Sequence, residues 1–184
     1  MNHTFMATFA DGLVERGVAS LRYQFPFMEN GSKRPDAPKV AHRAVRAATT
    51  EVLRRFPRLP LIAGGKSFGA RMTSQAQALE PLPGVRGLAF VGFPLHPAGK
   101  PAVDRAEHLK QVGIPMLFLQ GTRDGLADIQ LLQPAVKELG SLATLALSED
   151  ADHSFHVRAR SGRTDAQVMS ALLDTFVEWA AKRT

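Results

Sequence analysis

Short apolar runs alternate with amphipathic helical patterns along the whole chain, and this alternation restricts its fold more than any other feature. Five runs have the length and composition of strands: Val18–Phe25, Leu59–Ala63, Gly87–Phe93, Met116–Gln120 and Ala143–Leu147. Most of them are apolar on both faces, as is typical of strands buried in a parallel sheet. We therefore predict an α/β fold, a three-layer α/β/α sandwich with a mainly parallel sheet of about five strands.

Two of the other segments carry a clear apolar stripe at helical spacing. One stripe consists of Val40, Ala44, Ala48, Val52 and Phe56, and the other of Met169, Leu172, Leu173, Phe176 and Trp179. The chain has no internal repeat and no linker, and only residues 27–38, rich in Pro, Gly, Asn and Lys, have the composition of a long surface loop. With 184 residues it is long enough for a hydrophobic core, so we predict a single domain over residues 1–184.

The composition argues against several classes of protein. No apolar run reaches the roughly 18 residues that span a bilayer, and residues 1–12 lack the basic and long apolar segments of a signal peptide. The chain has no cysteine, which excludes disulfides and thiolate metal sites and favours a cytoplasmic location. Its net charge is +6, but the basic residues are dispersed and aromatic residues are few. We therefore expect a solvated basic surface and no nucleic-acid site.

The segment Leu61–Met72 reads LIAGGKSFGARM and fits two different kinds of site. The letters GGKS resemble the end of a phosphate-binding P-loop, which requires the pattern G-x-x-x-x-G-K-[ST]. The glycine that opens such a loop would fall at position 60, where this chain has Pro60, and residues 61–63 have the pattern of a strand. The spacing therefore excludes the phosphate site.

The same segment contains Gly65-Lys66-Ser67-Phe68-Gly69, the G-x-S-x-G pattern of a serine nucleophile. An apolar strand precedes it and a helical pattern follows at once, which is the strand–turn–helix arrangement of a nucleophile elbow. Such an elbow places the serine hydroxyl above the sheet, at the N-terminus of a helix. We predict that Ser67 is the nucleophile and that the backbone N–H of Phe68 stabilises an oxyanion.

A serine nucleophile needs a histidine base and an acid, and candidates for both follow later strand ends. Asp124 comes shortly after the run Met116–Gln120, and His153 follows the run Ala143–Leu147. Because the carboxyl ends of parallel strands meet at one side of a sheet, these side chains are expected beside Ser67. We predict that His153 accepts the serine proton and that Asp124 orients its imidazole.

Other polar residues near these positions have competing interpretations. Asp128 lies close to Asp124, but its position favours the start of a helix. Asp152 adjoins His153, and because neighbours in a chain seldom point at each other, Asp152 is expected to face solvent. His156 is an alternative base, farther from the strand end than His153.

Residues that line a substrate pocket come from loops, and the sequence gives only candidates for them. The candidates are Lys66, Phe68, Leu95, His96 and Leu126. Lys66 could instead tune the electrostatic field of the site or form a structural ion pair. Arg71, one turn into the helix, is expected to pair with a carboxylate. Surface or helix-face positions are the only interpretations for His3, His42 and His108.

These motifs resemble the alpha/beta-hydrolase superfamily, in particular its small, lidless members similar to dienelactone hydrolase. A closer similarity is to the hydrolase-like family that includes testis-expressed proteins and a subunit of a histone-acetyltransferase complex. The matching segments, which cover most of the chain in the family's order, are FMATFADGL, LRYQFPFMENG, AGGKSFGARM, GFPLHPAGKP, QGTRD and DHSFHV. The resemblance implies the fold predicted above and a triad of Ser67, Asp124 and His153.

The chain departs from this family at its start. Family members begin with further strands and a loop similar to H-G-x-G that supplies a second oxyanion N–H, whereas Met1–Met6 resembles only the tail of that loop. The strand that is absent would lie between Val18–Phe25 and Leu59–Ala63. Three hypotheses follow. Met1 is an internal methionine of a longer product, or the two flanking strands pair directly with the first helix displaced, or another copy fills the exposed edge in a homodimer.

The sequence thus favours a serine hydrolase that cleaves a small ester, thioester or related acyl substrate through an acyl-Ser67 intermediate, with no metal or organic cofactor. The segment Pro94–Gln111 is too short for a cap domain, so we expect a shallow, open pocket. Without one oxyanion donor, turnover would fall by about 10²–10³. The alternative is a weakly active or inactive interaction module whose basic surface meets an acidic partner. Neither hypothesis involves nucleic acid or a membrane.

Overall fold

The computed structural model describes residues 4–183, and strands alternate with helices along them. The strands are β1 (Leu61–Lys66), β2 (Val85–Val91), β3 (Met116–Gly121) and β4 (Ala143–Ser148). The α-helices are α1 (Thr4–Glu15), α2 (Pro26–Glu29), α3 (Pro38–Arg55), α4 (Phe68–Leu79), α5 (Ile129–Lys137) and α6 (Asp165–Ala181). Short 3-10 helices are η1 (Asp104–Gln111), η2 (Gly140–Leu142) and η3 (Ala159–Ser161). None of the described helices has the length and apolar character needed to cross a membrane.

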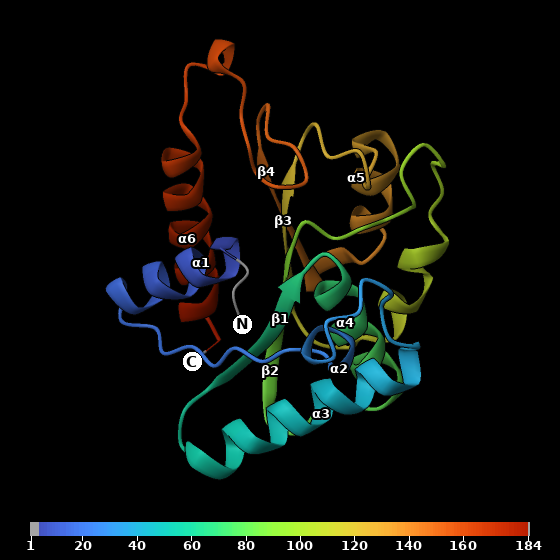
Figure 1. The fold of residues 1–184 in the computed structure, drawn as a ribbon, viewed down its shortest axis with the longest axis vertical. Coiled ribbons are helices and arrows are strands. Elements are labelled where there is room, and N and C mark those ends of the chain that lie inside the picture. The colour runs from blue at the N-terminus through green and yellow to red at the C-terminus, as the bar shows by residue number, and fades with distance from the viewer. Residues whose placement is uncertain (1–3, 184) are drawn as a thin grey trace.

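The strands form one parallel sheet in the order β1–β2–β3–β4 (Figure 1). The register pairs Lys66 with Val91 and Gly121 with Ser148, so the carboxyl ends of the strands lie at the same side of the sheet. Within the described residues, β1 and β4 are the outermost strands. The predicted α/β fold with a parallel sheet is confirmed.

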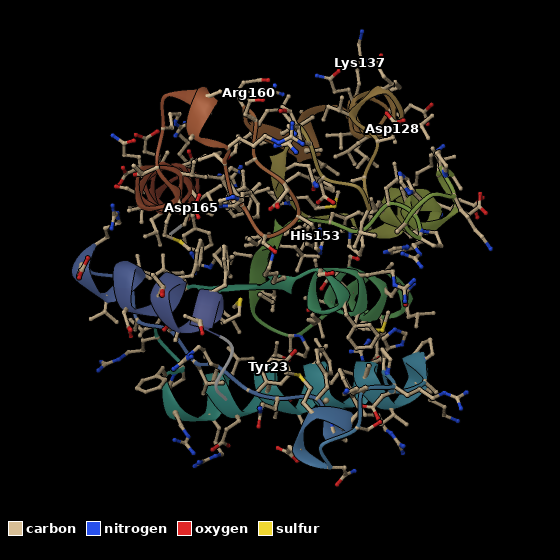
Figure 2. All side chains as sticks on the ribbon, turned by 45° about the horizontal axis from the view of Figure 1, so that its top comes forward. Tyr23, Asp128, Lys137, His153, Arg160 and Asp165 are labelled. Carbon is tan, nitrogen blue, oxygen red and sulfur yellow. The ribbon has the colours of Figure 1, made fainter. Side chains whose placement is uncertain are left out.

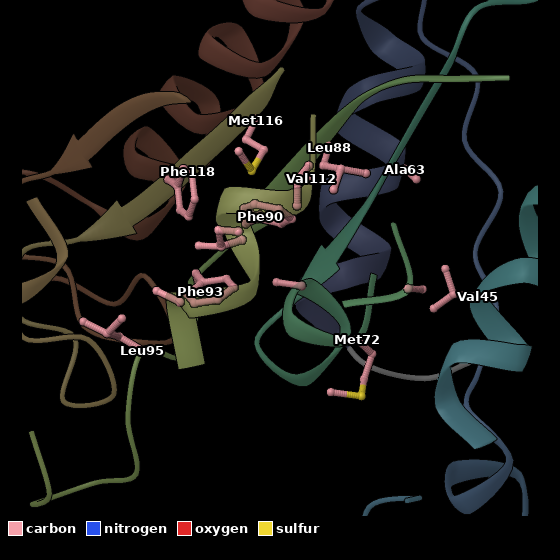
Figure 3. Packing of buried hydrophobic residues seen from close by; sticks show 14 of the residues in the cluster. Val45, Ala63, Met72, Leu88, Phe90, Phe93, Leu95, Val112, Met116 and Phe118 are labelled. Carbon is pink, nitrogen blue, oxygen red and sulfur yellow. The ribbon is translucent and has the colours of Figure 1, made fainter. Parts of the chain in front are cut away.

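Side chains of the inner strands alternate between the two faces of the sheet, and helices cover both faces. One core, on the face covered by α3, α4 and α5, includes Leu88, Phe90, Met116 and Phe118 (Figure 3). The second core, on the face covered by α1 and α6, includes Ala89, Val91, Leu117 and Leu119. The sheet is therefore the middle of three layers and is held by apolar packing on both faces.

The two predicted helical stripes differ in how well they match the buried faces. In α6, the buried side chains include Leu172, Leu173, Phe176 and Trp179, as predicted. In α3, the buried side chains are Ala41, Val45 and Thr49, which lie one position beyond the predicted stripe. These small residues allow α3 to pack closely on α4, while Phe56, the last residue of the predicted stripe, follows the helix and is 50% exposed.

The strand predicted at Val18–Phe25 is wrong, because the chain is irregular there and the described sheet has four strands instead of about five. A cavity of about 80 Å³, lined by Leu21, Tyr23 and residues of α3 and β1, lies beside this segment. The apolar side chains are nevertheless packed, since the ring of Phe25 contacts those of Tyr23 and Phe68 at centroid distances of 5.5 and 5.1 Å. The apolar pattern thus reflects side-chain packing without backbone pairing, and the hypothesis that this segment pairs directly with β1 is wrong.

Candidate active site

Three polar side chains from separate loops meet at the carboxyl end of the sheet. Ser67 follows β1, Asp124 follows β3 and His153 follows β4. The distance from His153 Nε2 to Ser67 Oγ is 2.9 Å, and the distance from His153 Nδ1 to Asp124 Oδ2 is 2.7 Å. Figure 2 shows His153 near the centre of the view. Both distances are those of hydrogen bonds, so the three groups form a continuous line.

Ser67 occupies a strained turn between β1 and α4. Its backbone angles are φ 52° and ψ −113°, a combination that residues with a side chain rarely adopt. Its N–H donates to the C=O of Val91 at 3.1 Å, which fixes the turn to β2. A Cβ atom at Gly65 would lie 2.9 Å from the backbone of Gly69, so glycine at 65 allows the strand and the helix to approach this closely.

The first backbone N–H groups of α4 lie directly after the serine. The N–H of Arg71 donates to the C=O of Ser67, so the N–H of Phe68 precedes the first helical hydrogen bond and has no acceptor within the helix. The positive end of the helix dipole lies at the same place. An N–H in this position is suited to stabilise negative charge that develops next to Ser67 Oγ.

Asp124 is buried, with 5% of its surface exposed, and both of its carboxylate oxygens have partners. Oδ1 accepts from the N–H of Leu126 at 2.8 Å. Oδ2 accepts from Nδ1 of His153 and from Nε2 of Gln120, the latter at 2.5 Å. Gln120 is fully buried, and its Oε1 accepts from the N–H of Phe93 at 2.9 Å. The sequence analysis missed Gln120, although a lone polar residue near the end of the apolar strand β3 is a signal that could have found it.

Residues 149–156, called the His153 loop below, carry the histidine. The carboxylate of Asp152 accepts from the N–H groups of Ser154 and His156 at 2.8 and 3.0 Å. In addition, the N–H of Asp152 donates to the C=O of His156 at 3.0 Å. Asp152 is half-buried and shapes the turn that contains His153, a role that the expected solvent-facing position did not include.

The other rival residues have structural partners of their own. Asp128 caps the N-terminus of α5, where its Oδ1 accepts from the N–H of Gln130 at 2.8 Å, as predicted. His156 is exposed, and its Nδ1 lies 2.8 Å from Oδ2 of Asp165. The hydrogen bond to this carboxylate raises the pKa of His156. His156 therefore pairs with Asp165, whereas His153 is the histidine that contacts Ser67.

The predicted pocket residues occupy different environments. Leu95 and His96 are 0% and 3% exposed, so they lie in the interior and not on a pocket wall, which corrects the prediction. Leu95 belongs to the hydrophobic core, because the chain after β2 turns inward there. His96 Nε2 accepts from the N–H of Asp128 at 2.8 Å and thereby links this segment to the start of α5. Leu126 and Phe68 are partly exposed and remain candidates.

Lys66 precedes the nucleophile, but its side chain extends to the His153 loop. Its Nζ donates to the C=O of His153 at 2.5 Å. The same atom lies 4.6 and 5.2 Å from the ring centroids of Phe5 and Phe155. Burial lowers the pKa of Lys66 from 10.5 to about 8, and two nearby carboxylates partly oppose this shift. The amino group thus contacts a backbone carbonyl and two rings of the candidate site.

The remaining side chains singled out in the sequence lie outside this cluster. His108, in η1, has its Nε2 2.7 Å from Ser74 Oγ, and burial lowers its pKa to about 4. His42 lies on α3 and is half-buried. Among the described residues Arg71 has no carboxylate partner, and its Nε is buried without a hydrogen bond, so the expected ion pair is wrong. His3 lies outside the described residues.

Comparison with known proteins agrees with this fold. Residues 1–181 match the family described as "Alpha/beta hydrolase domain". An alpha-beta serine hydrolase homologue from Coxiella burnetii has 23% identity and a TM-score of 0.74, and the match covers 95% of this chain and 77% of that one. An a/b serine hydrolase without lid from Xanthomonas campestris has 24% identity and a TM-score of 0.74, and the match covers 97% of this chain and 75% of that one. The esterase domain of a Rhodothermus marinus protein has 16% identity and a TM-score of 0.70, and the match covers 98% of this chain and 81% of that one. At these identities, the structural likeness shows the fold alone.

Proposed function

Because this chain belongs to the alpha/beta hydrolase family, we propose that it is a serine hydrolase that cleaves a small ester, thioester or related acyl compound. In this proposal Ser67 is the nucleophile, His153 is the base and Asp124 orients the imidazole. The observation that carries the proposal is the unbroken line of hydrogen bonds from Asp124 through His153 to Ser67.

The partners of His153 determine which of its nitrogens acts on the serine. A carboxylate accepts hydrogen bonds and does not donate them, so the bond between Asp124 and His153 requires a proton on Nδ1. Nε2 then has no proton and accepts the hydrogen bond of the Ser67 hydroxyl. Asp124 also accepts from Gln120 and from the N–H of Leu126, which fix the plane of its carboxylate. The imidazole is therefore held in the tautomer that general-base catalysis requires.

The proposed reaction proceeds in two stages. His153 Nε2 takes the hydroxyl proton while Ser67 Oγ attacks the carbonyl carbon, and the resulting oxyanion is stabilised by the N–H of Phe68. The bond to the leaving group then breaks, the leaving group takes the proton from His153, and acyl-Ser67 remains. Water attacks the acyl group with His153 again as base. The carboxylic acid product leaves, and the proton returns to Ser67.

A fluorophosphonate probe, which labels activated serines, tests the proposal. We expect the wild-type protein to be labelled and Ser67→Ala to lose labelling completely, because the probe bonds to the serine Oγ, which alanine lacks. Loss of a triad serine also lowers turnover by about 10⁶. Ser74→Ala is a matched control, since Ser74 also contacts a histidine but is fully buried and has no assigned role in the site. This variant should be labelled like the wild type. Hydrolysis of short-chain p-nitrophenyl esters should follow the same pattern.

Two results would contradict the proposal. One is a folded wild-type protein that is not labelled, and the other is equal labelling of the wild type and Ser67→Ala. Circular dichroism of each sample separates loss of the nucleophile from loss of the fold. Absence of labelling in a folded sample would favour a non-catalytic interaction module.

A further inference from the structure

Lys66 connects the strand that carries the nucleophile with the loop that carries the histidine. It is the last residue of β1, and it donates a hydrogen bond to the backbone of His153, which lies 87 positions later in the chain. This carbonyl belongs to the same residue whose imidazole contacts Ser67. The hydrogen bond therefore joins the residue next to the proposed nucleophile, Lys66, to the proposed base, His153.

We propose that Lys66 is a positioning residue of the hydrolase, whose amino group holds the backbone of His153 where its imidazole reaches Ser67. This inference rests on the proposed function and adds a residue to it. Asp124 orients the ring of His153, and Lys66 holds the main chain of the same residue. In this proposal Lys66 acts through the backbone of His153 and takes no part in the bond changes at Ser67.

The His153 loop needs contacts from outside, because its own backbone is strained. Asp150 and Phe155 have φ angles of 57° and 62°, although both carry side chains. Each such residue costs about 1 kcal/mol or more relative to an extended or helical conformation. The loop also lies directly on the end of β3, where a Cβ atom at Gly121 would be 2.3 Å from the C=O of Ala151. External contacts such as that of Lys66 must therefore hold this conformation.

The carbonyl and the two aromatic rings beside the Lys66 amino group interact more strongly with its charged form than with its neutral form. The ring of Phe5 comes from α1 and the ring of Phe155 from the His153 loop, and the two rings stack at a centroid distance of 5.7 Å. A cation close to aromatic rings is attracted to them, and a charged donor makes a stronger hydrogen bond than a neutral one. The amino group thus joins α1, β1 and the His153 loop at one point.

This contact depends on pH in a defined direction. Burial lowers the pKa of Lys66 to about 8, while the carboxylates of Asp124 and Asp152 act in the opposite direction. Below pH 8 the amino group is charged and makes the full contact. As the pH rises through about 8 the proton is lost, and with it the attraction to the rings and much of the hydrogen-bond strength.

The first test compares labelling rates of variants with the fluorophosphonate probe at pH 7. Lys66→Met should lower the rate constant by about 10–100-fold, since a displacement of about 1 Å at a catalytic group has an effect of this size. Lys66→Arg keeps the charge and the donor and should recover most of the rate. Lys137→Met is the matched control, because Lys137 is exposed on α5 and lies far from His153 in Figure 2. Its rate should equal that of the wild type.

The second test is the pH profile of the labelling rate, corrected for hydrolysis of the probe. The wild-type rate should fall above about pH 8, whereas the rate of Lys66→Arg should stay constant to pH 9.5, because a guanidinium keeps its charge. A merely structural lysine would not change the shape of this profile. The inference is overturned if Lys66→Met is labelled like the wild type, or if Lys66→Arg shows the same alkaline decline as the wild type.

Hydrogen exchange of residues 149–156 gives a result that does not depend on catalysis. The amides of the His153 loop should exchange faster in Lys66→Met than in the wild type or Lys137→Met. If the wild type is not labelled but this difference is present, the proposed function fails and the contact of Lys66 with the loop is retained. Equal exchange in all three proteins would overturn the inference whatever the labelling shows.

Discussion

Gln120 connects the acid of the proposed triad with the segment that follows β2. Its side chain donates to Asp124 and accepts from the N–H of Phe93, and it is fully buried. Gln120→Leu would remove both bonds and leave a buried N–H and one carboxylate site unpaired, at a cost of about 2–4 kcal/mol. We expect the Tm to fall by roughly 5–15 °C, together with a lower labelling rate at Ser67. Differential scanning calorimetry and the fluorophosphonate assay measure the two effects.

Gln133→Leu provides the control for this prediction. Gln133 is exposed on α5, so its replacement should change the Tm by less than about 2 °C. A Gln120→Leu protein as heat-stable as the wild type would show that Asp124 does not depend on this glutamine.

The approach of the triad side chains could be predicted from the sequence, because each of them follows a strand end. Parallel strands bring Ser67, Asp124 and His153 to one side of the sheet whatever the details of the helices. Their catalytic roles remain predictions. The contacts of Lys66 and Gln120 could not be predicted, because they depend on how far a side chain extends toward a loop or strand that is distant in sequence.

At the scale of elements, the apolar runs predicted correctly the four strands that pair within the sheet. The runs that became β1, β2, β3 and β4 were identified to within a few residues. The run Val18–Phe25 has a similar composition but pairs with none of the four strands, and it packs its side chains without backbone pairing. Apolar periodicity reports burial, and it cannot distinguish burial against a strand from burial against helices.

The contact between η1 and α4 makes the stability of the protein depend on pH. The ordinary pKa of histidine, 6.5, is lowered to about 4 for His108 by burial and, to a smaller extent, by Arg71 and His42. Between these values the unfolded chain binds the proton and the folded protein does not. The free energy of unfolding therefore falls as the pH falls from 6.5 to 4, by roughly 2 kcal/mol after allowance for the part of the ring that water reaches. Urea unfolding at pH 7, 5.5 and 4 measures this loss.

His108→Gln separates this contribution from that of other groups. Glutamine can keep a hydrogen bond to Ser74 but does not titrate in this range, so the variant should lose less stability on acidification than the wild type. His156→Gln is a control on an exposed histidine, whose pKa is raised and not lowered. If the His108→Gln and wild-type proteins lose equal stability between pH 7 and pH 4, His108 is not the responsible group.

At the scale of the whole molecule, backbone strain is concentrated at one end of the sheet. Among residues 4–183, the non-glycine residues with positive φ are Ser67, Asp150 and Phe155, and all of them lie in the turns and loops at the carboxyl end of the strands. The apolar cores on the two faces of the sheet hold these turns in place. The free energy that stabilises the cores therefore also maintains the geometry of the candidate site.

This distribution predicts that a change at the nucleophile can stabilise the protein. Ser67→Gly would relieve a strain of about 1–3 kcal/mol, while glycine would add roughly 0.5–1 kcal/mol of chain entropy to the unfolded state. Ser67→Ala loses the same hydroxyl but keeps the Cβ atom and the strain. We expect the Tm of Ser67→Gly to exceed that of Ser67→Ala by about 2–4 °C. A lower Tm for Ser67→Gly would show that the turn is not strained in solution.

The positive φ at position 67 also bears on how this chain would respond to selection for heat resistance alone. Such a selection would favour glycine at the one position where a hydroxyl is required for the proposed chemistry. Heat-resistant variants selected in this way would lack the proposed nucleophile and would be inactive. A search for durable variants must therefore score turnover alongside survival at high temperature.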